Sequence, residues 1–152
     1  DAEASAACKS VRAAGCIPAL AEQLVRSQAA DLDPFMHALT LSILANLAYL
    51  GVEPEIRQAG CLEHMQAALT ADRAKTLHYA VAGVQNMTNR DAESVAAVKR
   101  NRAAVGALRI LLDSTDETLF LNASGAVANI SRPVRVLTTV GPDGRRRTQL
   151  VL

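Results

Sequence analysis

The sequence repeats two short motifs three times, in the same order and with nearly the same spacing. The first motif occupies residues 11–20, 56–65 and 98–108, and its last apolar residues lie 45 and 43 residues apart. The second motif is centred on an asparagine, and the three asparagines lie 40 and 43 residues apart. A period of about 40 to 47 residues is typical of solenoids built from helical pairs or triplets. The sequence therefore predicts stacked helical repeats, in which each repeat covers the apolar face of its neighbour.

The composition favours the same interpretation. The 152 residues include 29 Ala and 19 Leu, but only two Tyr, two Phe and no Trp. Ala and Leu are strong helix formers, whereas a β-sandwich of this size is enriched in Val, Ile, Thr and aromatic residues. Small Ala side chains also let neighbouring helices approach closely. We therefore expect an all-α fold and exclude an all-β one.

Each repeat is expected to contain a short helix, a second helix after a turn, and a long third helix. In the first repeat the short helix covers residues 4–14, and Gly15 supplies the turn because glycine adopts positive φ freely. Pro18 marks the start of the second helix, since its missing N–H costs nothing there. Asp33 is the expected N-cap of the third helix, which covers residues 34–50.

Apolar residues recur at helical spacing along the third helices. We expect these stripes to be buried between stacked helices, because no single repeat could cover them alone. In the first and third repeats the stripes consist of Leu39, Ile43, Leu47 and Leu50, and of Leu119, Ala123, Val127 and Ile130.

The repeated segments resemble those of the armadillo repeat family. The resemblance is carried by GCIPAL at residues 15–20, by LANLA at residues 44–48, and by their recurrences. It implies a right-handed α-solenoid with repeats at about 4–51, 52–90 and 91–131. The motifs are shared in part with the related HEAT arrays, and the third repeat departs from the pattern where Ala103 replaces the glycine.

The recurring asparagines Asn46, Asn86 and Asn129 are the most informative polar residues. The resemblance implies that they line a concave groove, where a side-chain amide offers both a donor and an acceptor to the main chain of an extended peptide. The alternative is a bond from each asparagine to a neighbouring helix or turn, because a buried amide needs a partner in either case.

The residues one turn before the asparagines are Ser42, Ala82 and Gly125, and His78 lies two turns before the second asparagine. Armadillo receptors for nuclear-import signals place Trp one turn before the asparagine, where it holds lysine side chains by stacking and cation–π contacts. The absence of Trp argues against a receptor for basic peptides, which we keep as an alternative function. We expect the small residues to line the groove together with His78.

The sequence contains no recognisable catalytic or phosphate-binding motif. Cys61 and His64 lie three residues apart, but two ligands without a second pair do not make a zinc site. The odd number of cysteines without framework spacing indicates a reduced, intracellular setting. Glu53 and Glu55 flank Pro54 and are expected to be a solvated helix start rather than an acid–base pair.

We therefore expect a non-enzymatic scaffold without metal or cofactor, cytoplasmic, and binding a partner protein or peptide. The resemblance implies a place in a larger assembly, such as a cytoskeletal or axonemal complex. Three repeats are close to the minimum for a stable stack. No polar capping repeat precedes them, so we expect either a longer array or a partner that covers the ends.

Residues 132–152 differ from the rest of the chain. They carry five Arg and one Asp, whereas the preceding residues carry a net charge of −3. Pro142 and Asp143 stand between two β-prone segments, which predicts either a hairpin or a disordered tail. Contact with an acidic protein surface is favoured over nucleic-acid binding, since no aromatic residue is interleaved for base stacking. The residues proposed for this contact are Arg145, Arg146 and Arg147.

Overall fold

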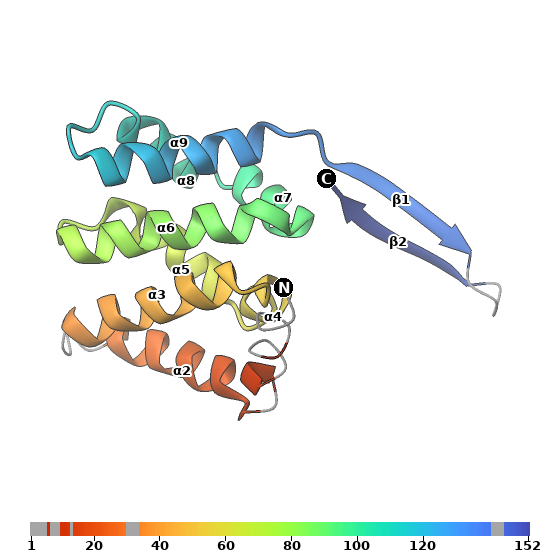
Figure 1. Ribbon diagram of the computed structural model, residues 1–152, viewed down its shortest axis with the longest axis horizontal. Coiled ribbons are helices and arrows are strands. Elements are labelled where there is room, and N and C mark those ends of the chain that lie inside the picture. Colours follow the sequence, from red (N-terminus) through yellow and green to blue (C-terminus); the bar gives the residue numbers. More distant parts are fainter. Residues whose placement is uncertain (1–5, 7–9, 13, 30–33, 141–144) are drawn as a thin grey trace.

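A computed structural model of the chain shows a stack of helices followed by a β-hairpin (Figure 1). Three long helices, α3, α6 and α9, lie side by side and form one layer of the stack. The shorter helices pack behind them, and together they enclose one continuous apolar core. The structure describes residues 6, 10–12, 14–29, 34–140 and 145–152.

Each long helix is the third helix of its repeat, as the sequence predicts. The first repeat contributes α2 and α3, the second α4, α5 and α6, and the third α7, α8 and α9. The predicted first helix of the first repeat lies mostly outside the described residues. The helices are α2 (Cys16–Ala29), α3 (Pro34–Tyr49), α4 (Glu53–Gln58), α5 (Cys61–Ala67) continued by a 3-10 turn (Ala68–Thr70), α6 (Ala74–Arg90), α7 (Ala92–Arg100), α8 (Arg102–Leu111) and α9 (Glu117–Ser131).

The turn between the first and second helices contains the predicted glycine in two repeats and an asparagine in the third. Gly15 and Gly60 adopt φ values of 60° and 77°, in the left-handed region that glycine tolerates best. The third repeat has Asn101 at the turn, with φ at −86°, and its side chain accepts the Ala104 N–H as an N-cap. An asparagine cap therefore replaces the glycine turn. The second helix of the first repeat begins at Cys16, two residues before the predicted Pro18.

The buried face of α3 differs from the predicted one. Leu39 and Ile43 are 40% and 38% exposed, so the expectation that they pack into the core is wrong. The reason is that α3 is apolar on almost every side, so periodicity alone could not select the buried face. The α9 prediction is confirmed for Leu119, Ala123 and Ile130, which are buried. In α3 the buried side chains are Ala38, Thr40, Leu41, Leu44, Ala45 and Ala48.

The tail forms the predicted hairpin. Strands β1 (Arg135–Val140) and β2 (Arg146–Val151) pair antiparallel and extend away from the helical stack (Figure 1). Contacts between β2 and α7 hold the base of the hairpin against the third repeat. The predicted Pro142–Asp143 turn lies outside the described residues. Among the described residues, no helix is both long enough and apolar enough to cross a membrane.

Candidate protein-binding surface

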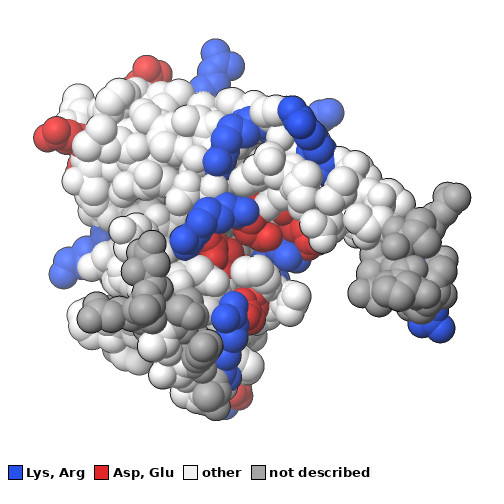
Figure 2. All heavy atoms as spheres, turned by 45° about the vertical axis from the view of Figure 1, so that its right-hand side comes forward, with Lys and Arg blue, Asp and Glu red and all other residues white. Residues whose placement is uncertain are grey.

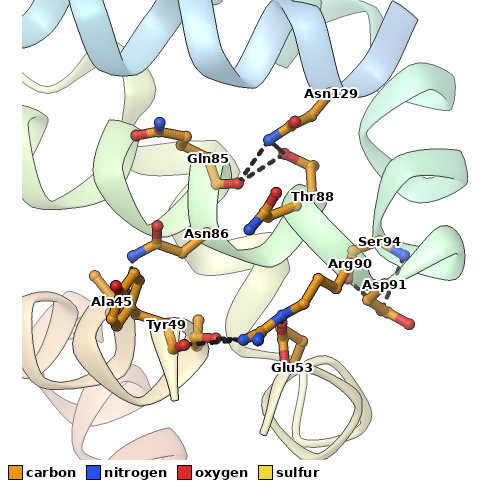
Figure 3. Close-up of polar contacts among 12 residues, drawn as sticks. Ala45, Tyr49, Glu53, Gln85, Asn86, Thr88, Arg90, Asp91, Ser94 and Asn129 are labelled. Atoms are coloured by element: carbon orange, nitrogen blue, oxygen red, sulfur yellow. Dashed lines mark hydrogen bonds and ion pairs between the residues drawn. The ribbon is translucent and has the colours of Figure 1, made fainter. Parts of the chain in front are cut away.

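Two of the three recurring asparagines connect successive third helices. Asn86 Nδ2 donates to the carbonyl oxygen of Ala45 at 2.9 Å, and Asn129 Nδ2 donates to the carbonyl oxygen of Gln85 at 3.1 Å (Figure 3). Ala45 and Gln85 each immediately precede the asparagine of their own helix. The same bond is therefore made at both junctions, with a shift of one repeat. This geometry matches the alternative in which the asparagines bind a neighbouring helix.

In the described part of the chain no third helix precedes α3, which carries the first asparagine. Asn46 is exposed, and within the described part of the chain no hydrogen bond is recorded for its amide. Asn86 and Asn129 remain partly exposed despite their bonds. These three residues, here called the asparagine row, therefore combine a structural role in the stack with amide groups that solvent or a ligand can reach.

The small residues one turn before the asparagines lie on the same side of their helices. Ser42, Ala82 and Gly125 are all half-buried. A Cβ atom added at Gly125 would collide with the side chain of Gln85 on the preceding helix. This position therefore faces the neighbouring helix, and its small size allows the helices to approach.

His78 lies away from this row, at the side of α6 that faces α9. Its Nε2 lies 3.0 Å from Oδ2 of Asp116, the residue that caps α9. Asp116 also accepts the Leu119 N–H, and this bond, with smaller contributions that include His78, lowers the pKa of its carboxyl group. His78 thus connects two repeats and is not brought together with the asparagines.

Two arginines that the sequence interpretation did not single out reinforce the same junctions. Arg90 Nη2 donates to the carbonyl of Tyr49 at 2.9 Å, at the end of α3 (Figure 3). Arg132 Nη2 donates to the carbonyls of Thr88 and Asn89, at 2.8 and 2.6 Å, at the end of α6. Cations at helix C-termini satisfy carbonyls that have no partner within the helix. The sequence feature that could have identified them is their spacing, since Arg90 and Arg132 follow a recurring asparagine by four and three residues. Arg132 therefore contacts the helical stack, although the sequence analysis grouped it with the tail.

Arg90 also explains why the prediction for Glu53 is wrong. Glu53 is only 3% exposed, and its Oε1 accepts a hydrogen bond from Arg90 Nε at 3.0 Å. A carboxylate enters the interior only with a charged or hydrogen-bonding partner, and the second repeat supplies it from the far end of α6. Glu53 therefore belongs to the core between the repeats and is not a solvated helix start.

The first helices are connected by a separate series of polar contacts. Arg12 forms an ion pair with Glu55. Arg57 Nε lies 2.7 Å from Oδ2 of Asp91, and Arg57 Nη1 lies 2.6 Å from Oε2 of Glu93. Arg12 and Arg57 occupy the same position of the first motif, so this series is periodic as well. Figure 2 shows basic and acidic side chains side by side on this edge of the stack. Such pairs orient neighbouring repeats but contribute little stability where they are exposed.

Cys61 and His64, which the sequence places three residues apart, lie on α5. Cys61 is buried, and burial, with the nearby Glu63 charge, raises the pKa of its thiol to about 11, so it stays protonated. His64 lies half-buried on the same helix. Among the described residues, no group of three or more His, Cys, Asp or Glu side chains is arranged to hold a metal ion.

The basic residues of the tail lie at the distal end of the hairpin. Arg145 is exposed directly before β2, and β2 begins with Arg146 and Arg147, opposite Val140 and Thr139 of β1. This end of the hairpin points away from the helical stack, whose third helices carry the asparagine row (Figure 1). The predicted contact with an acidic partner therefore concerns a second surface.

The parallel third helices, the two-helix layer behind them and the shared core define an armadillo-like helical repeat protein. A designed armadillo repeat protein superimposes with a TM-score of 0.70 at 20% identity, over 81% of this chain and 50% of that one. Two engineered proteins superimpose with TM-scores of 0.70 and 0.71 at 25% and 24% identity. The superposed part comprises 82% and 83% of this chain and spans 49% and 30% of those two proteins, so the match covers half of their length or less. No protein-family model and no curated protein sequence matches the chain.

Proposed function

We propose that the chain is a non-enzymatic scaffold that binds an extended segment of a partner protein along α3, α6 and α9. The observation that carries the proposal is the asparagine row, which places the exposed amide of Asn46 and the partly exposed amides of Asn86 and Asn129 on three helices that lie side by side. Packed helices lie about 8–10 Å apart, a distance spanned by two to three residues of extended peptide. Successive amides can therefore meet main-chain groups of one peptide at regular intervals.

The neighbours of the asparagines favour a particular kind of segment. Ser42 and Ala82 are small and uncharged, so they leave room for apolar side chains and offer no stacking surface to lysine. Main-chain recognition by amides is tolerant of sequence, and specificity then depends on the size of the side chains beside the row. An apolar, extended segment is therefore a better ligand than a lysine-rich one. The resemblance to armadillo proteins extends the proposal to a place in a multi-protein assembly, cytoskeletal or axonemal.

The test is selection of linear peptides from a random displayed library on the 152-residue chain, followed by titration of the enriched peptides. Asn46→Ala removes an amide that makes no recorded bond within the described chain, so the stack is expected to remain intact. Loss of one main-chain hydrogen bond is expected to weaken binding about fivefold. Gln58→Ala is the matched control, because it removes an exposed amide from α4, in the other layer.

Titration of a lysine-rich peptide separates this proposal from a nuclear-import type of receptor. We expect it to bind at least tenfold more weakly than the enriched peptides, since no aromatic side chain is present to hold lysine. Enriched peptides that bind the Asn46→Ala variant as tightly as the unaltered chain would exclude the asparagine row as the binding surface.

A further inference from the structure

The large exposed apolar side chains lie at the two ends of the helical stack and on the hairpin. Among the described residues, none belongs to the second repeat, at residues 52–90. The third helix of the second repeat, α6, lies between α3 and α9, whereas α3 and α9 each pack against only one other third helix in the described part of the chain. The exposed residues are Val25, Phe35, Met36, Leu39, Ile43 and Tyr49 in the first repeat, Ile110, Phe120 and Leu121 in the third, and Val136, Leu137 and Leu152 beyond it.

The N-terminal face of the stack is the side of α3 that bears Leu39, Ser42, Ile43 and Asn46. The direction in which this side of α3 faces follows from the other repeats. The asparagines of α6 and α9 each bond to the preceding third helix, so the equivalent side of α3 faces away from α6. The residue equivalent to Ser42 in α9 is Gly125, which touches that helix too. In α6 and α9 this side is therefore partly covered by the preceding third helix, and its residues are half-buried or buried. In α3 no third helix covers this side within the described residues, and Leu39 and Ile43 are partly exposed there.

The C-terminal face of the stack is the side of α9 that bears Leu121, Ser124 and Ala128. These residues are equivalent, by the repeat spacing, to Ala38, Leu41 and Ala45 of α3, which are buried, and the carbonyl of Ala45 accepts the Asn86 bond from α6. Among the residues that the structure describes, no helix follows α9, and Leu121 is 55% exposed while Ala128 is also exposed. The hairpin leaves from the end of α9 and extends sideways (Figure 1).

We propose that a second copy of this chain binds head to tail, with the C-terminal face of one copy on the N-terminal face of the other. The contact would continue the interface that already joins α3 to α6 and α6 to α9. Asn46 would then donate to the carbonyl oxygen of Ala128 in the second copy, as Asn86 donates to Ala45 within one chain. Leu39 and Ile43 would cover Leu121, and the small Ser124 and Ala128 would allow close approach.

The junction between copies is expected to be weaker than the junctions within a chain. At the position equivalent to Arg90, the first repeat has Leu50, so no guanidinium is available to bind the carbonyls at the end of α9. The contact is therefore reversible and depends on concentration. Because the two faces differ, the association is heterologous and can extend beyond a dimer.

The experiment is analytical ultracentrifugation of the full 152-residue chain over a range of concentrations, alone and as variants. The unaltered chain is expected to sediment as monomer, dimer and higher species in reversible exchange. Leu39→Glu and Leu121→Glu are each expected to sediment as monomers, because each buries a charge on one face of the contact. Val136→Glu is the matched control, since it changes an exposed apolar residue of the hairpin and should leave association unaltered.

Mixing the two monomeric variants tests the head-to-tail geometry directly. The Leu39→Glu chain retains its C-terminal face and the Leu121→Glu chain retains its N-terminal face, so a mixture should form a dimer and nothing larger. Both positions are already exposed, and unchanged helical circular dichroism would verify that the variants fold. A monomeric unaltered chain at millimolar concentration, or a mixture that stays monomeric, would overturn the proposal. Peptide binding by the Leu121→Glu monomer tests the proposed scaffold function separately.

Discussion

The two junctions between third helices use the same polar contacts but differ in what surrounds the arginine. At the α3–α6 junction, Arg90 binds the end of α3 and also the buried carboxylate of Glu53. At the α6–α9 junction, Arg132 binds the carbonyls of Thr88 and Asn89, and no carboxylate bonds to it in the part of the chain that the structure describes. One arginine therefore compensates a buried charge, and the other satisfies carbonyls near solvent.

This difference shows that an apparently repeated residue can have unequal energetic roles. A carbonyl at an exposed helix end can bond to water when its arginine is removed. A carboxylate that is almost fully buried has no such substitute, and its uncompensated charge destabilises the folded state strongly. Position in the repeat thus identifies the contact, while burial determines its contribution.

The largest predicted effect is at Arg90. Arg90→Met is expected to lower the free energy of unfolding by about 3 kcal/mol, because Glu53 loses its charged partner inside the stack. Arg132→Met is expected to lower it by only about 1 kcal/mol, the contribution of hydrogen bonds whose acceptors regain water. Urea denaturation at pH 7 followed by circular dichroism measures both values.

The double variant Arg90→Met, Glu53→Gln separates the charge from the packing. It should recover at least half of the loss, because the buried group is then neutral and keeps its hydrogen-bonding capacity. Equal losses for Arg90→Met and Arg132→Met would contradict the distinction between the two junctions.

A smaller effect is predicted for the asparagines within the junctions. Asn86→Ala and Asn129→Ala are each expected to be about 1 kcal/mol less stable than Asn46→Ala, because only they lose an inter-helix hydrogen bond. All three substitutions gain the same helix propensity, so Asn46→Ala is the appropriate reference. The measurement is urea denaturation at low micromolar protein concentration, where association between copies does not contribute to the measured stability. Three indistinguishable midpoints would mean that the inter-helix bonds add nothing to stability.

Much of the fold follows from the sequence because it depends on local chemistry. Glycine at positive φ, proline at the first helical position and a regular period all report local backbone geometry, and Gly15, Gly60 and Pro34 lie where this chemistry requires. The buried face of α3 could not be predicted in the same way. Its residues are apolar all round, and burial of Leu41 rather than Leu39 depends on where α6 and α2 lie.

The candidate site shows the same limit. The asparagine period predicts that these residues share a role, but not which partner takes each amide. The asparagines bond to the main-chain carbonyls of Ala45 and Gln85. Every residue has such a carbonyl, so the residue type does not reveal the acceptor. The Arg90–Glu53 pair joins residues 37 positions apart, so neither residue signals the other locally.

The smallest predicted effect concerns the contact between the second and third repeats at Asp116. Accepting the Leu119 N–H lowers the pKa of this carboxyl in the folded state, so its contribution to stability is complete above the unfolded pKa of about 3.9. That contribution is lost as the pH falls through the lower, folded pKa. Asp116→Asn keeps an N-capping side chain but cannot ionise. The stability of the unaltered chain relative to Asp116→Asn should therefore decline between about pH 5 and pH 2, as measured by urea denaturation across that range. A difference that stays constant with pH would show that the ionised carboxylate contributes nothing to the start of α9.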